Sequence, residues 1–177
     1  MRIGVFCSSS PTIDNKYLQL ATDLGKAIGD LSWELISGGG HISMMGAVAR
    51  GARSMGGRTV GVLPQSLVDI EFADNDCDEL HIVETMGERK AMITDISDAF
   101  ITLPGGAGTL EEFFEIWVGR YLKFHDKQIV ILDPFGLYSP LHELILHLES
   151  ENFIKPGMRE LVEWTTSVEA AIAACKK

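Results

Sequence analysis

Two patterns of apolar residues alternate along this chain. Short apolar runs are typical of buried strands, whereas apolar residues that recur every three or four positions are typical of one face of a helix. The predicted strands span residues 2–7, 33–36, 58–63, 80–83, 99–103 and 128–132. The predicted helices span residues 17–28, 44–55, 88–96, 110–122, 137–148 and 168–175. A short apolar piece at 161–164 is left without an assignment.

This alternation predicts an α/β fold, namely a Rossmann-like, doubly wound parallel sheet with helices on both faces. The chain has 177 residues, 46% of them hydrophobic, which suits one domain over residues 1–177. Ligands of such sheets bind beyond the carboxyl ends of the strands. We therefore expect the loops that follow four of the strands to share one pocket. These loops span residues 8–10, 38–40, 86–90 and 105–109.

The candidate chemistry centres on the stretch Leu-Pro-Gly-Gly-Ala-Gly-Thr-Leu-Glu-Glu at residues 103–112. It joins a predicted strand to a predicted helix. Glycines let backbone approach a ligand closely, and the unpaired N–H groups of a first helical turn favour a phosphate. The predicted phosphate-binding residues are Gly105, Gly106, Ala107, Gly108, Thr109, Leu110 and Glu111, with Lys90 as a nearby cation. The stretch has neither the lysine of a P-loop nor the GxGxxG spacing of a dinucleotide site.

Two features of this region also have purely structural explanations. Thr109 and Glu112 have the spacing of a capping box, in which Thr109 would cap the helix, and on spacing alone that explanation is favoured for Glu112. The glycines before Thr109 argue against it, because a simple cap does not need them. Arg89 and Lys90 could grip an anion, but an Arg-Lys pair near a helix start is usually solvated surface.

Composition narrows the classes of partner. A formal charge of −10 disfavours nucleic acid. No run of 18 apolar residues occurs and the start leads at once into a strand, so we expect no membrane segment or signal peptide. Cys7, Cys77 and Cys175 lie far apart and form no CxxC pair, which favours a cytoplasmic location without disulfides or zinc. The five histidines show no metal-binding spacing, and no metal site is predicted.

The run Pro-Gly-Gly-x-Gly-Thr-x-x-Glu at residues 104–112 resembles the signature of the LONELY GUY (LOG) family. These proteins are cytokinin riboside 5′-monophosphate phosphoribohydrolases, long labelled lysine decarboxylases. Further matches cover nearly the whole chain. They are Phe-Cys-Ser-Ser at 6–9, Ser-Gly-Gly-Gly at 37–40, Met-Gly at 45–46 and Met-x-x-Arg-Lys at 86–90.

The resemblance implies a hydrolase that cleaves the N-glycosidic bond of an adenosine 5′-monophosphate, with or without an N6 substituent, to free base and ribose 5-phosphate. It maps the catalytic pair onto Arg89 and Glu112 and a substrate-contacting glutamate onto Glu71. It also implies a homodimer without a cofactor, which agrees with the wide apolar surface expected for helix 110–122. The alternative is a non-catalytic nucleotide or molybdenum-cofactor carrier.

Some residues depart from the family pattern. Gly87 stands where relatives usually have histidine, and Ser43 stands where they have glycine. The segment 117–123 also differs, and we expect it to border the base pocket or the subunit interface. The phosphate and ribose machinery is intact, whereas the preferred base does not follow from the residues.

Overall fold

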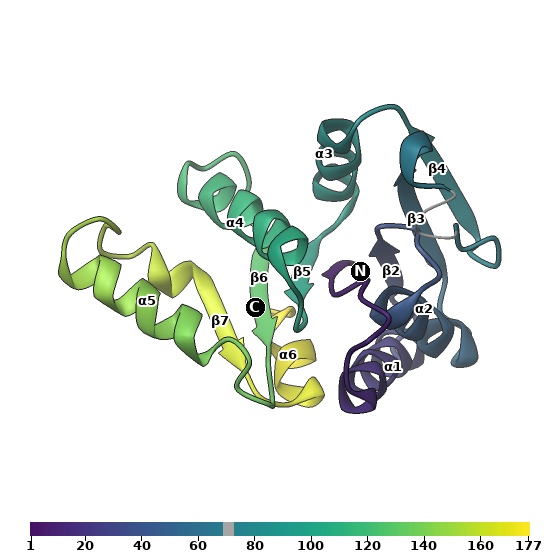
Figure 1. Cartoon of the computed structure of the whole chain (residues 1–177), viewed down its shortest axis with the longest axis horizontal. Helices are drawn as coiled ribbons and strands as arrows, with labels where there is room; N and C mark the ends of the chain where they lie inside the picture. The colour runs from purple at the N-terminus through teal and green to yellow at the C-terminus, as the bar shows by residue number, and fades with distance from the viewer. Residues whose placement is uncertain (69–72) are drawn as a thin grey trace.

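The structure is a computed structural model that describes residues 1–68 and 73–177. In these residues seven parallel strands form one sheet in the order β4-β3-β2-β1-β5-β6-β7 (Figure 1). The strands are β1 (Arg2–Phe6), β2 (Glu34–Ser37), β3 (Thr59–Pro64), β4 (Glu79–Val83), β5 (Ala99–Thr102), β6 (Gln128–Leu132) and β7 (Val162–Thr165). The predicted parallel sheet is confirmed, and the unassigned piece at 161–164 supplies its edge strand β7.

The helices cover both faces of the sheet, as predicted. They are α1 (Asn15–Asp30), α2 (Ser43–Ser54), α3 (Met86–Ile96), α4 (Ala107–Tyr121), α5 (Ser139–Ser150) and α6 (Val168–Ala174), with short 3-10 turns η1 (Gln65–Leu67) and η2 (Arg159–Leu161). Helices α1, α2 and α6 pack into one hydrophobic core, and α3, α4 and α5 contribute to a second core on the opposite face (Figure 1). No helix in the described part of the chain is long and apolar enough to cross a membrane.

Glycines bring α1 and α2 very close together. A Cβ atom added to Gly25 would lie 2.1 Å from the carbonyl oxygen of Val48, and one added to Gly51 would lie 2.4 Å from that of Thr22. Contacts this short are not tolerated between a side chain and backbone. The glycines therefore allow α1 and α2 to pack closely.

The strand order creates a switch point beside β1. From β1 the sheet continues through β2 and β3 to β4 in one direction, and through β5 and β6 to β7 in the other. The helices that follow β1 and β5 leave toward opposite faces, because α1 packs into the first core and α4 into the second. A crevice beyond the carboxyl ends of the strands at such a point is where open α/β sheets bind ligands.

Candidate functional site

Helix α4 begins in the glycine stretch itself. Its first residue is Ala107, its N-cap is Gly106, and no side chain caps it. The predicted capping box is therefore wrong, because Thr109 lies in the first turn and Glu112 in the second. The extended backbone of Gly106 already turns the chain into the helix, so no side-chain cap is needed. The amides of this first turn lack intrahelical acceptors, as at the start of every α-helix.

The three glycines of this stretch differ in what they contact. A Cβ atom on Gly105 would lie 2.2 Å from Thr109 Oγ1, so Gly105 is needed for the loop to pack on the buried Thr109 side chain. A Cβ atom on Gly106 or Gly108 would meet no protein atom within 4 Å. Packing within the chain thus explains Gly105 but not the other two.

Gly106 and Gly108 line a cleft of about 350 Å³ that is also lined by parts of β1–α1, α2, α3 and α4. Its walls are Cys7, Ser8, Ser9, Ser10, Met45, Leu67, Met86, Arg89, Gly106, Ala107, Gly108, Thr109, Glu111 and Glu112. Three of the four predicted loops meet here, and both predicted catalytic residues are present. The volume lies within the range of about 300–1,000 Å³ usual for small-molecule sites.

Arg89 is buried and approaches the glycines that follow β2. It lies in the first turn of α3, which is capped by the Thr85 hydroxyl accepting from the Glu88 amide at 3.1 Å. A Cβ atom on Gly38 would lie only 1.8 Å from Arg89 Nη2, so this glycine makes room for the guanidinium. The surface explanation of the Arg-Lys pair is wrong for Arg89. The loop 38–40 supports the cleft through this contact without lining it.

The Lys90 side chain is directed at glutamates of α4. Its ammonium forms ion pairs with Glu111 and with Glu115, the latter at 2.5 Å, and it is not among the residues that line the cleft. Hydrogen bonds to Glu111 and then to Glu115 raise the pKa of Lys90 above its ordinary value. The lysine joins α3 to α4, so its assignment as a phosphate ligand has no support in the geometry.

Leu110 and Glu71 are two further predicted binding residues. The amide of Leu110 donates to the Gly106 carbonyl at 3.0 Å, and its side chain packs against the second core. The Leu110 amide is thus engaged in a hydrogen bond of α4, and its side chain in the core. Glu71 lies outside the described residues.

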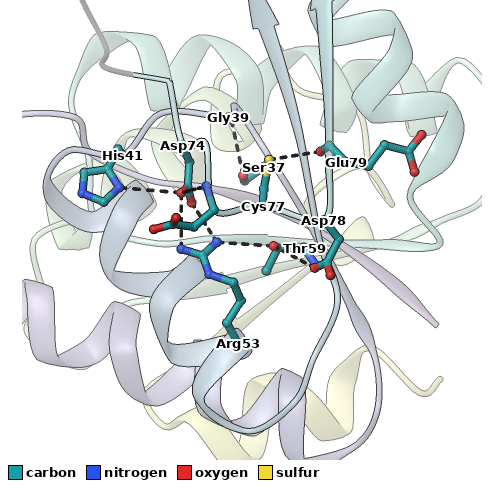
Figure 2. Close-up of polar contacts among 10 residues, drawn as sticks. Ser37, Gly39, His41, Arg53, Thr59, Asp74, Cys77, Asp78 and Glu79 are labelled. Atoms are coloured by element: carbon teal, nitrogen blue, oxygen red, sulfur yellow. Dashed lines mark hydrogen bonds and ion pairs between the residues drawn. The ribbon is translucent and has the colours of Figure 1, made fainter.

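Asp74 lies in the acidic stretch 74–79 and contacts Arg53 of α2 (Figure 2). This buried carboxylate accepts hydrogen bonds from Arg53 of α2 at 2.9 and 3.3 Å, and His41 lies 3.6 Å away. The Asp74 amide donates to the Gly39 carbonyl at 2.9 Å. Asp74 therefore fixes the chain to the same glycine loop that accommodates Arg89, a role that its place in an acidic run did not suggest.

Tyr138 makes a contact with the glycine loop that the sequence did not predict. Its hydroxyl donates to the carbonyls of Leu103 and Gly105 at 3.2 and 3.1 Å. The predicted helix 137–148 placed this tyrosine in a helix, whereas α5 begins at Ser139 and Tyr138 precedes it. The adjacency of β5 and β6 could have suggested the contact, but no spacing in the sequence indicates it.

Together the sheet, its switch point and the glycine-loop cleft define a Rossmann-like α/β protein with a built small-molecule site. Comparison with known proteins identifies the family of the chain. Residues 45–175 match the family model described as possible lysine decarboxylase. The chain is 46% identical over 173 residues to a cytokinin riboside 5′-monophosphate phosphoribohydrolase of Mycobacterium tuberculosis, covering 98% of this chain and 92% of that protein. It is 42% identical to one of Rhodococcoides fascians, covering 98% and 88%. The chain belongs to the LOG family of phosphoribohydrolases.

The fold is shared more widely. The molybdenum cofactor carrier protein of Chlamydomonas reinhardtii matches with a TM-score of 0.74 at 27% identity, covering 99% of this chain and 95% of that one. The Rossmann-like architecture is thus common to proteins of different printed function. Fold alone does not choose between the hydrolase and the carrier.

Proposed function

We propose that this protein hydrolyses the N-glycosidic bond of cytokinin riboside 5′-monophosphates, as its relatives are named, and releases the free base and ribose 5-phosphate. The observation that carries the proposal is the meeting of Arg89 and Glu112 with the first turn of α4 in one cleft. Identity of 46% over nearly the whole chain supports the same activity.

In this proposal the 5′-phosphate binds at the start of α4. The amides of Ala107, Gly108 and Thr109 belong to the first turn, where unpaired N–H groups and the helix dipole favour an anion. Gly106 and Gly108 leave open space beside these amides. A phosphate oxygen could then approach the backbone without meeting a side chain.

Glu112 and Arg89 act on the sugar and its bond to the base. Glu112 lies one turn beyond Gly108 on the same helix and lines the cleft, so a phosphate at the helix start brings the attached ribose toward its carboxylate. Glycoside hydrolysis passes through an oxocarbenium-like transition state that a carboxylate stabilises. Glu112 either stabilises this cation or orients the attacking water, while Arg89 positions the substrate and balances charge.

The bond changes are simple and consume only water. The bond between C1′ of the ribose and the base nitrogen breaks, and its electron pair leaves with the base. The water oxygen bonds to C1′, and the water supplies the proton that the departing base takes up. No electron transfer is involved.

A direct incubation tests the activity. The protein is incubated separately with N6-isopentenyladenosine monophosphate and with AMP, and free base and ribose 5-phosphate are measured by chromatography. We expect equimolar release of both products from at least one nucleotide. No release from either, at enzyme concentrations comparable to the substrate, would overturn the proposal and leave the alternative of a carrier, whose fold the chain shares.

We also propose that the protein forms a homodimer through α4. Phe113, Ile116 and Trp117 of this helix are buried, while Phe114 and Val118 remain 38% and 41% exposed and Leu122, just beyond it, 51%. This second apolar face lies on the helix that carries Glu112, and exposed apolar patches commonly mark subunit contacts. We expect a second copy of the chain to cover this face.

Light scattering coupled to size exclusion tests the dimer. The chain mass is 19.4 kDa, and we expect about twice that mass for the wild type. Val118→Asp should give a monomer, whereas Phe153→Asp, at a residue 82% exposed outside α4, should leave the mass unchanged. A wild-type protein with the mass of a single chain would contradict the dimer.

The cytoplasm is the location we propose. Three cysteines that lie far apart in the sequence suit a reducing compartment. Fractionation of cells that make the native protein checks this, and recovery outside the cytoplasmic fraction would contradict it.

A further inference from the structure

Tyr138, which precedes α5, contacts the glycine loop. Its side chain is buried and does not belong to the cleft wall, but its hydroxyl reaches the carbonyls of Leu103 and Gly105. Burial raises the pKa of the Tyr138 phenol above its ordinary value, so the group stays protonated and can donate. The hydroxyl therefore contacts the strand end and the glycine loop at once.

The contact with Gly105 sets the direction of the next amide. The described chain contains no cis peptide bond, and in a planar trans peptide the carbonyl and the following N–H point in opposite directions. A Gly105 carbonyl directed at Tyr138 therefore turns the Gly106 N–H away from the phenol. Gly106 lines the cleft, so this direction leads toward the ligand side of the loop.

This peptide needs an external constraint. It joins two glycines, and glycine populates both halves of φ space at little cost, so a Gly-Gly peptide plane rotates more readily than any other. Leu103 precedes a proline, which fixes the chain before the loop but donates no hydrogen bond. The Tyr138 hydroxyl supplies such a constraint, because it hydrogen-bonds to the carbonyls of both Leu103 and Gly105.

Tyr138 is itself held in place. The buried carboxylate of Asp133, directly after β6, accepts a hydrogen bond from the Tyr138 amide at 2.7 Å and another from the Phe135 amide at 3.3 Å. Gly136, between them, has φ +71°, which suits the turn. The end of β6 thus orients the tyrosine, and the tyrosine orients the loop after β5.

We propose that Tyr138 is a positioning residue for phosphate binding, which holds the Gly105–Gly106 peptide so that the Gly106 N–H joins the α4 amides in the anion site. The inference rests on the proposed function in placing the substrate phosphate there. It adds a residue from outside the signature and outside the cleft wall. Its loss should weaken phosphate-bearing ligands specifically.

Tyr138→Phe tests this, because it removes only the hydroxyl. Ser150→Ala is the matched control, because it removes a hydroxyl that donates to a backbone carbonyl, that of His147 at 2.8 Å, on α5 and outside the cleft wall. Binding of ribose 5-phosphate is measured by titration calorimetry, with KM and kcat for the nucleotide that the wild type hydrolyses and the midpoint of thermal unfolding. We expect Tyr138→Phe to raise Kd and KM about tenfold, which corresponds to ~1.4 kcal/mol, with kcat changed less than about threefold. Ser150→Ala should match the wild type.

The outcomes separate the two proposals. A Kd for ribose 5-phosphate within about twofold of the wild type, or a lower kcat and unfolding midpoint at unchanged KM, would overturn the positioning role, because a merely structural role predicts that pattern. If the wild type hydrolyses no nucleotide, the proposed function fails, yet the ribose 5-phosphate titration still decides the role of Tyr138. Should Tyr138→Phe not fold, Asp133→Asn keeps one acceptor and should raise Kd about threefold, while an unchanged Kd there would count against the inference.

Discussion

Two pairs of glycines in this protein have different surroundings. Gly25 and Gly51 lie between α1 and α2, where an added Cβ atom would come within 2.1 and 2.4 Å of backbone carbonyls. Gly106 and Gly108 lie at the start of α4, where an added Cβ atom would meet nothing within 4 Å. Packing explains the first pair, whereas in our proposal the second pair leaves room for the phosphate.

This difference separates stability from function along one chain. Residues at the α1–α2 contact should affect the free energy of unfolding and have little direct effect on the reaction. Residues of the α4 start should affect binding or turnover while the fold stays intact.

The largest effect should come from Glu112→Gln. Glutamine keeps the size of the side chain but removes the charge that the oxocarbenium-like transition state needs, so turnover should fall by about 10²–10⁴-fold. The loss of turnover should be far larger than any change in the unfolding free energy, which for single substitutions is typically about 0.5–3 kcal/mol. The matched control is Glu115→Gln, which lies on the same helix outside the cleft wall. Retention of most activity by Glu112→Gln would return Glu112 to a structural role.

Gly25→Ala should cause the largest loss of stability. The new methyl group would collide with the Val48 carbonyl, and overpacking of this kind costs about 1–3 kcal/mol. Gly87→Ala is the control, since its Cβ would find its nearest contact at 3.8 Å in α3 and should be tolerated or mildly stabilising. Denaturant unfolding measures both. A Gly25 variant as stable as the wild type would show that the helix contact can relax.

Gly108→Ala should have opposite effects on stability and binding. Alanine is the better helix former by up to ~1 kcal/mol, so unfolding should be unchanged or slightly harder. The methyl group would project into the space proposed for the phosphate, and KM for the nucleotide should rise about tenfold, or ~1.4 kcal/mol. Steady-state kinetics beside denaturant unfolding checks both. A destabilised variant with normal KM would remove the distinction between the two glycine groups.

Ser43 should give the smallest effect, because two terms oppose each other there. Its backbone has φ +51°, which strains a non-glycine residue, but its hydroxyl donates to the Ser10 carbonyl at 2.6 Å and so ties α2 to the cleft loop. Ser43→Gly loses both and should change stability by less than about 0.5 kcal/mol. Ser43→Ala keeps the strain and should cost about 1 kcal/mol. Equal stability of the two variants would show that the positive φ carries no strain, and equal stability of Ser43→Ala and the wild type would show that the bond has no net value.

The fold could be predicted from the sequence because alternating buried strands and amphipathic helices leave few arrangements. The cleft could be predicted as well, since the carboxyl ends of parallel strands share an edge and the glycine signature marks one of them. The role of Lys90 did not follow, because its glutamate partners lie on another helix. The sequence predicts too late a start for α4, because Thr109 and Glu112 have the spacing of a capping box. The observed N-cap is Gly106, which has no side chain to indicate its role. Tyr138 is 33 residues from Gly105, and only the completed sheet brings them together.

The central claim is that the start of α4 binds the 5′-phosphate and that this binding drives the reaction. The most direct test compares kcat/KM for AMP or N6-isopentenyladenosine monophosphate with that for the same nucleoside without its phosphate. Contacts to a remote group can be used to lower the barrier at the reacting bond, so removal of the phosphate should reduce kcat/KM by at least about 10³-fold. Comparable turnover of adenosine and AMP, or of the isopentenyl pair, would contradict the account.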